Sequence, residues 1–173
     1  MRRVIVIGSG GAGKSTLARR LGEATGLPVH HLDVLYWKPG WVPTPDAEWD
    51  ATIAGLAARP AWIMDGNYGR TMDQRLAACD TVVFMDLPRT VCLARVLRRW
   101  LRFRGRARPD LDPGCPEQMT WEFARWVWRY PRDRRPGVLR RLAALGPDKR
   151  VVHLRSRREA DRFLAGVQAS GGR

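Results

Sequence analysis

The chain has 173 residues, 45% of them hydrophobic, three cysteines without paired spacing, and a formal net charge of +14. These properties fit one globular domain and argue against disorder, a disulfide scaffold and a zinc site. We expect a reducing, cytoplasmic setting. No apolar run approaches the roughly 18 residues of a membrane span, so we expect no membrane partner.

The net positive charge of +14 comes entirely from the second half of the chain. Residues 1–88 contain nine basic and nine acidic side chains, whereas residues 89–173 contain 22 and eight. Nearly all the basic residues are arginine. Genomic base composition is one explanation. A binding site for an anionic ligand is another, because guanidinium groups make bidentate contacts with phosphate.

Strand and helix patterns alternate along the chain. We expect strands at residues 4–7, 29–32, 61–64, 81–85 and 150–154, and helices at 14–25, 46–58, 71–78, 89–103, 119–130, 138–145 and 157–167. Residues 36–45 and 105–116 are expected to be loops. This order predicts an α/β fold of the P-loop NTPase type, a three-layer sandwich with a five-stranded parallel sheet and helices on both faces. In such a sheet the ligand site lies beyond the carboxyl ends of the strands.

The most specific motif lies between the first strand and the first helix. Residues 8–15 read G-S-G-G-A-G-K-S and fit the pattern G-x-x-x-x-G-K-[ST]. Backbone N–H groups of such a loop surround phosphates, its lysine reaches the β and γ phosphates, and its Ser15 hydroxyl takes a Mg²⁺ position. We therefore predict an ATP and Mg²⁺ site formed by Gly8, Gly10, Gly11, Ala12, Gly13, Lys14, Ser15 and Thr16.

Three aspartates directly follow predicted strands and should meet the phosphate loop. Asp33 could orient an attacking hydroxyl or accept its proton. Asp65 and Asp86 could each hold Mg²⁺, directly or through water, and we favour Asp65 because of the residues that follow it. His30 and His31 lie nearby but lack the spacing of metal ligands.

The segment after the third strand resembles a nucleotide-kinase motif. Residues 65–74 read D-G-N-Y-G-R-T-M-D-Q, similar to D-G-[FY]-P-R-T-x-x-Q of adenylate kinase and related nucleoside monophosphate kinases. Asn-Tyr-Gly stands where the family has Phe-Pro, which adds one residue. The resemblance implies that Arg70 grips an acceptor phosphate and that Arg95 and Arg99 contact the transferring phosphates. The alternative is that these arginines face solvent.

Asp33 points to a different acceptor. Its place after the second strand resembles the shikimate and gluconate kinases, where that position serves the acceptor or the metal. Asp33 therefore favours a hydroxyl acceptor, while Arg70 favours a phosphorylated one, and the sequence leaves both open. Trp37 and Trp41 lie in the next loop, where they could stack on the acceptor or pack the loop onto the domain.

Taken over residues 3–145, the pattern looks closest to a bacterial group of adenylate-kinase-like P-loop proteins labelled topology modulation protein. The matching segments are 31–33, 36–41, 62–68, 106–110 and 114–117. The resemblance implies one kinase-like domain over residues 1–173, with an acceptor-binding insert at about 34–60 and an arginine-rich helical lid at about 100–135. A lid closing over the phosphates would exclude water.

These features predict an ATP-dependent phosphotransferase that acts on a small-molecule or nucleotide acceptor, as a monomer or homodimer. The catalytic group is expected to comprise Lys14, Asp33, Asp65, Arg95 and Arg99, with Asp33, Trp37, Asp65 and Arg70 binding the acceptor. An alternative is a nucleic-acid-binding NTPase or polynucleotide kinase that uses the basic half of the chain. A non-catalytic nucleotide sensor is a third possibility.

Overall fold

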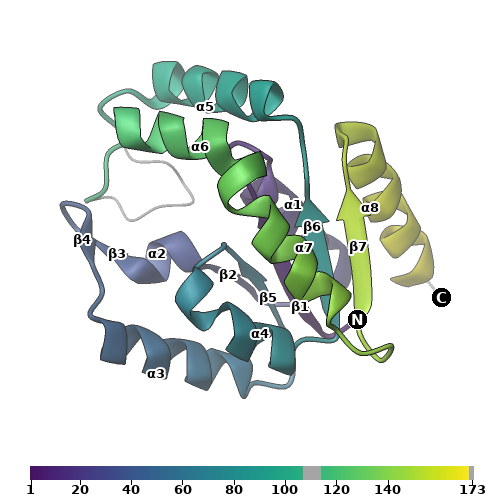
Figure 1. The fold of residues 1–173 in the computed structure, drawn as a ribbon. Coiled ribbons are helices and arrows are strands. Elements are labelled where there is room, and N and C mark those ends of the chain that lie inside the picture. The colour runs from purple at the N-terminus through teal and green to yellow at the C-terminus, as the bar shows by residue number, and fades with distance from the viewer. Residues whose placement is uncertain (107–113, 172–173) are drawn as a thin grey trace.

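Five parallel strands form the central sheet of the computed structural model, which describes residues 1–106 and 114–171 (Figure 1). They are β1 (Arg3–Gly8), β2 (Val29–His31), β5 (Trp62–Asp65), β6 (Thr81–Met85) and β7 (Arg150–Leu154), in the order β2-β5-β1-β6-β7. Every pairing in this sheet is parallel. The predicted α/β fold is thereby confirmed.

Alternating side chains of β1 divide the core into two layers. Val4 and Val6 face one layer, and Ile5 and Ile7 face the other, all fully or almost fully buried. The first layer is covered by α1 (Lys14–Thr25), α5 (Arg89–Phe103), α6 (Trp121–Asp133) and α8 (Arg157–Gly171). The second is covered by α2 (Leu32–Tyr36), α3 (Asp46–Ala57), α4 (Met72–Ala78) and α7 (Arg135–Ala143). Helices therefore cover both faces of the sheet (Figure 1).

The strand register brings three loops to one edge of the sheet. Val6 of β1 is level with Asp65 at the end of β5, and Gly8 is level with Met85 at the end of β6. His31, at the end of β2, is level with Asp65 as well. The phosphate loop thus leaves the sheet between the ends of its neighbours, which is where open α/β sheets bind ligands.

The segment expected to be a loop at residues 36–45 contains a small antiparallel hairpin. Its strands are β3 (Trp37–Lys38) and β4 (Val42–Pro43), and Gly40 turns the chain with φ at +78°. Thr44 fixes the return, since its N–H and its hydroxyl both donate to the carbonyl oxygen of Tyr36, each at 2.8 Å. Two-residue strands are too short to give a periodic signal, so the sequence prediction was wrong here.

Helix α6 does not stop before Pro131, as the sequence analysis expected, but continues to Asp133. The proline removes one N–H from the helix, and its fixed φ is compatible with helical backbone. The helical pattern then resumes, because the N–H of Arg134 donates to the carbonyl oxygen of Tyr130 at 3.0 Å. Burial of Val127 and Tyr130 holds the turn before the proline against the core. Packing therefore outweighs the loss of one hydrogen bond.

The predicted lid at about 100–135 includes residues 107–113, among them Arg108, which lie outside the described residues. The parts of the lid on either side are connected, since the N–H of Glu117 donates to the carbonyl oxygen of Arg106 at 2.9 Å. Among the described residues, no helix has the length and apolarity needed to cross a membrane.

Candidate active site

A cavity of about 1130 Å³ lies at the carboxyl edge of the sheet. Its wall brings together Gly10, Gly11, Ala12, Gly13, Lys14, Ser15, Thr16, Asp33, Trp37, Asp65, Arg95 and Arg99, all of which the sequence analysis had selected. Segments that are more than 80 residues apart in the sequence thus meet at one site. This convergence makes the cavity the candidate active site.

Two glycines of the phosphate loop leave no room for a side chain, because they lie directly against the backbone of neighbouring elements. Gly11 has φ at +76°, and a Cβ atom there would lie 2.2 Å from the carbonyl oxygen of Cys92 in α5. At Gly8, with φ at +147°, a Cβ atom would lie 2.3 Å from the carbonyl oxygen of Met85. The loop is therefore held between β6 and α5.

Two predicted cations contact the phosphate loop: Lys14, which belongs to the motif, and Arg95, which comes from α5. The Lys14 ammonium donates to the carbonyl oxygen of Ser9 at 3.0 Å, so it lies back across the loop. The Arg95 guanidinium donates to the carbonyl oxygen of Ala12 at 3.2 Å. Both positive charges therefore lie at the phosphate loop, just before α1 begins.

Asn67 clamps the first residue of the phosphate loop, a role that the sequence analysis missed. The N–H of Gly8 donates to Asn67 Oδ1 at 3.0 Å, and Asn67 Nδ2 donates to the Gly8 carbonyl oxygen at 2.8 Å. The amide thus replaces a neighbouring strand where β5 has ended. Asn67 belongs to the Asn-Tyr-Gly segment that departs from the nucleotide-kinase motif, and this departure was the available signal.

Asp65 lies at the cavity with one oxygen held and one free of partners. Its Oδ2 atom lies 2.9 Å from Nδ1 of His31. Its Oδ1 atom is buried and has no hydrogen-bond partner in the described part of the chain. A buried carboxylate oxygen needs a hydrogen bond or a cation, so this atom fits a magnesium-side role.

Asp86, the other candidate for the metal side, is already engaged. Its carboxylate accepts from Arg135 Nε at 2.9 Å and lies 2.8 Å from Nε2 of His153. Burial acts to raise the pKa of Asp86, but the hydrogen bonds from Arg135 and His153 outweigh it, and the net shift is downward. Asp86 is absent from the cavity lining, and the geometry favours Asp65.

Asp33, in the first turn of α2, is held by a tyrosine. The Tyr68 hydroxyl donates to Asp33 Oδ1 at 2.6 Å. Burial and the charge of Asp33 both raise the pKa of Tyr68, so the hydroxyl stays protonated and remains a donor. The Tyr68 ring lies 4.8 Å from the rings of both Tyr36 and Trp49, between centroids. Aromatic packing therefore fixes the direction of the hydroxyl.

The β3–β4 hairpin joins the predicted lid on the cavity wall. Trp37 and Trp41 both line the cavity, with ring centroids 5.6 Å apart in an edge-to-face arrangement. Trp41 has φ at +62°, and its Nε1 donates to the carbonyl oxygen of Pro116 at 3.1 Å. Gly40 donates to the carbonyl oxygen of Gly114 at 2.9 Å. The acceptor-side insert and the end of the lid are thus fastened together.

Arg99 faces the cavity in an ion pair. Its Nε atom lies 2.9 Å from Oε1 of Glu117, a buried carboxylate that also lines the cavity. Arg70 lies elsewhere. It pairs with Asp50 at 2.7 Å and with Asp46 at 3.0 Å on α3, and it is absent from the cavity lining. The structure therefore does not bring Arg70 to the other predicted site residues.

The residues present fit Mg²⁺ bound together with nucleotide phosphates. Among residues 1–106 and 114–171, no three His, Cys, Asp or Glu side chains gather into a metal-binding cluster. Mg²⁺ in phosphotransferases needs no such cluster, because it is held by one or two protein oxygens and by the substrate phosphates. Ser15 and the partnerless oxygen of Asp65 supply protein oxygens on the cavity wall.

Comparison with known proteins adds evidence on the fold. No protein-family model and no curated relative matches the chain. A putative kinase from Chloroflexus aurantiacus matches with a TM-score of 0.56 and 15% identity, covering 98% of both chains. A shikimate kinase from Acinetobacter baumannii in complex with shikimate gives 0.55 and 17%, covering 98% of this chain and 94% of that one. A sugar kinase from Janibacter gives 0.51 and 19%, covering 99% and 97%.

At these identities the likeness establishes the fold alone. The chain shares its five-stranded parallel sheet and flanking helices with kinases of small molecules. The finer resemblance to the topology modulation protein group stays a prediction.

Proposed function

We propose that this protein is an ATP-dependent phosphotransferase that moves the γ-phosphoryl group of Mg-ATP to a hydroxyl group of a small acceptor. The observation that carries the proposal is the shared cavity, which is lined by both the phosphate loop and the Tyr68-held carboxylate of Asp33. A phosphate-binding loop and a candidate base in one cavity are what transfer to a hydroxyl requires. The shared fold with small-molecule kinases supports the same reaction class.

On the nucleotide side, the loop N–H groups and Lys14 would bind the phosphates, and Ser15 and Asp65 would hold the metal. Bound Mg²⁺ would neutralise charge that develops on the phosphate oxygens during transfer. Arg95 extends from α5 to the loop at Ala12, so its positive charge is available on the cavity side of the phosphates. Preorganised positive charges of this kind stabilise the negative charge that develops in the transition state of phosphoryl transfer.

On the acceptor side, Asp33 would orient the attacking hydroxyl and accept its proton. The bond from Tyr68 occupies one oxygen of that carboxylate and leaves the other for the substrate. Trp37 and Trp41 offer aromatic surface on the same wall, suited to the apolar face of a ring. The fastening of Trp41 to Pro116 would let the acceptor insert and the lid move together and exclude water.

A hydroxyl acceptor is favoured over a nucleoside monophosphate by the position of Arg70. Its guanidinium is paired with Asp50 and Asp46 outside the cavity. A monophosphate acceptor would need to draw Arg70 away from both carboxylates. Asp33, which suits a hydroxyl, lines the cavity without any rearrangement.

The proposal is tested by ATP consumption with Mg²⁺ across a panel of acceptors: sugars and polyols, nucleosides, hydroxy acids, nucleoside monophosphates, and DNA or RNA ends. Turnover is expected with one hydroxyl compound and should fall by about 10²- to 10³-fold in Lys14→Ala. Lys38→Ala is the matched control, because Lys38 pairs with Glu48 and is absent from the cavity lining.

Turnover confined to monophosphates would overturn the hydroxyl assignment and restore Arg70 as an acceptor residue. Turnover that depends only on nucleic acid would favour the alternative function of the basic half of the chain. ATP consumption that is unchanged in Lys14→Ala would overturn the phosphate-loop assignment itself.

A further inference from the structure

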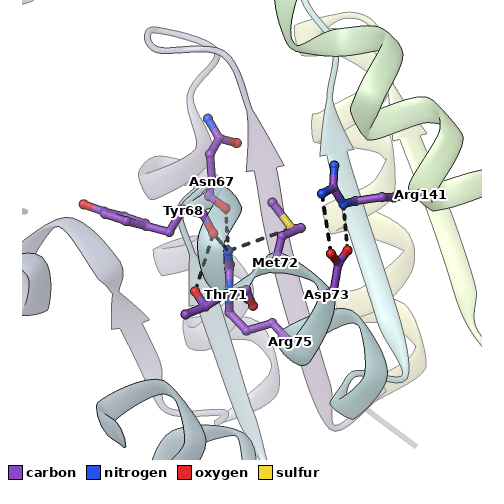
Figure 2. Close-up of polar contacts among 7 residues, drawn as sticks. All are labelled: Asn67, Tyr68, Thr71, Met72, Asp73, Arg75 and Arg141. Carbon is purple, nitrogen blue, oxygen red and sulfur yellow. Dashed lines mark hydrogen bonds and ion pairs between the residues drawn. The ribbon is translucent and has the colours of Figure 1, made fainter. Parts of the chain in front are cut away.

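Arg75 of α4 is fully buried, and its guanidinium donates hydrogen bonds to backbone carbonyl oxygens of the loop that follows β5. Its Nε donates to the carbonyl oxygen of Thr71 at 3.4 Å, and Nη1 donates to that of Gly66 at 2.9 Å. Its Nη2 donates to the carbonyl oxygens of Asn67 and Tyr68. Figure 2 shows the guanidinium beside Asn67, Tyr68 and Met72 Sδ.

A buried cation of this kind is unusual. The side chain has 0% exposure, and among the described residues no carboxylate pairs with it. Burial lowers the pKa of Arg75 to about 10, so it remains charged at neutral pH. The loop carbonyl oxygens therefore supply the negative partial charge that would otherwise come from an acid.

The loop that Arg75 holds has a backbone that needs support. Gly66 has φ at +146°, and Tyr68 has φ at +33°, a region that aromatic residues rarely occupy. In this conformation the carbonyl groups turn inward to the guanidinium. The side chains of Asn67 and Tyr68 point away from it, as Figure 2 shows.

Those two outward side chains contact opposite halves of the candidate site. The Asn67 amide makes both hydrogen bonds to Gly8, where the phosphate loop begins. The Tyr68 hydroxyl holds Asp33 on the acceptor side. One loop therefore connects the two halves, and its shape is fixed from behind by Arg75.

We propose that Arg75 is a positioning residue for both halves of the site, and that it acts through Asn67 on the phosphate loop and through Tyr68 on the acceptor carboxylate. The kinetic part of this inference rests on the proposed kinase function. The structural part does not, because it concerns hydrogen bonds that exist without substrate.

Amide hydrogen exchange at Gly8, resolved by NMR, tests the structural part directly. The Gly8 N–H donates to Asn67, and Arg75 does not touch Gly8. We expect Arg75→Met to speed exchange of this amide by about tenfold or more, as Asn67→Ala should. In the variant that combines Arg75→Met with Asn67→Ala, the Gly8 amide should exchange no faster than in Asn67→Ala alone. Arg75→Lys, which keeps a buried cation with fewer donors, should be intermediate, and it carries the test if Arg75→Met does not fold.

Arg141→Met is the matched control. Arg141 belongs to α7 and pairs at 2.6 Å with Asp73, which lies on α4 as Arg75 does. The Arg141 side chain is exposed to solvent and does not reach the loop (Figure 2). It should leave exchange of the Gly8 amide unchanged. If Arg75→Lys and Arg75→Met loosen residues 66–71 and leave Gly8 as protected as in the unmodified protein, Arg75 holds only its own loop and the proposal is wrong.

The kinetic test uses the combination of Arg75→Lys with Tyr68→Phe, in the acceptor assay described above. If Arg75 acts through Tyr68, the combined variant should lose clearly less kcat than the product of the two single losses, because both changes weaken the same interaction between Tyr68 and Asp33. Losses that multiply would overturn the acceptor half of the proposal. An absence of turnover in the unmodified protein would reject the kinase function while leaving the exchange result at Gly8 to stand by itself.

Discussion

The close seating of the phosphate loop on α5 predicts a large stability loss for Gly11→Ala. Gly11 has φ at +76°, and the new Cβ atom would lie 2.2 Å from the carbonyl oxygen of Cys92 and 2.9 Å from Cγ2 of Val96. Gly26→Ala is the matched control. Gly26 ends α1 with φ at +71°, and a Cβ atom there would meet nothing within 4 Å.

The two variants share one cost and differ in another. Placing alanine in left-handed backbone costs about 1–2 kcal/mol at either position. At Gly11 the atom in the way belongs to the backbone and cannot rotate aside, so overpacking adds about 1–3 kcal/mol. Effects of alanine on the unfolded chain are similar at both positions and cancel in the comparison.

Urea denaturation measures this difference, and thermal melting provides a second readout. We expect Gly11→Ala to be less stable than Gly26→Ala by about 1–3 kcal/mol, where each kcal/mol lowers Tm by about 2–4 °C for a chain of this size. Equal losses in the two variants would refute the reasoning, because they would show that the loop is not seated on the α5 backbone.

Three further predictions concern single side chains. Lys14→Ala should lower kcat by about 10²- to 10³-fold with little change in Tm, because it removes one phosphate-side charge; a steady-state assay and a thermal melt check this. Asp33→Asn should lower kcat by about 10²-fold or more with a smaller change in the KM for ATP, whereas a change confined to the KM for ATP would count against an acceptor-side role. The pKa of Asp86 is lowered, because burial, which raises it, is outweighed by the hydrogen bonds from Arg135 and His153. The ionised Asp86 therefore contributes fully to the stability of the fold above its unfolded-state pKa near 4, and this contribution is lost as pH falls below that value. In urea titrations between about pH 3 and 7, Asp86→Asn should therefore flatten the acid loss of stability; an unchanged pH profile would contradict the assignment.

The parts of the fold that the sequence predicted are those with local signals. The strands around Val4 and Val82 are continuous apolar runs, as expected for strands covered on both faces. The phosphate loop has a spacing that follows from its chemistry. Asp33 and Asp65 could be placed beside the phosphate loop from the sequence, because parallel strands end at the same edge of the sheet.

The parts that the sequence missed depend on contacts between distant residues or on very short elements. Asn67 reaches Gly8 across 59 residues, and nothing near Asn67 in the sequence indicates its partner. The burial of Arg75 is unexpected for a residue type that usually lies at the surface. Arg70 is a different case, since the motif suggested a place at the site, whereas its side chain pairs with Asp46 and Asp50 of α3 outside the cavity.

The measurement that tests the central claim most directly is transfer of labelled γ-phosphate from ATP, followed in the product for the unmodified protein and for Asp33→Asn. The account predicts that the label appears on a hydroxyl oxygen of the acceptor in the unmodified protein. In Asp33→Asn this transfer should be strongly reduced, while ATP still binds. Label found only in inorganic phosphate with every acceptor, or transfer unaffected by the Asp33 change, would contradict the account.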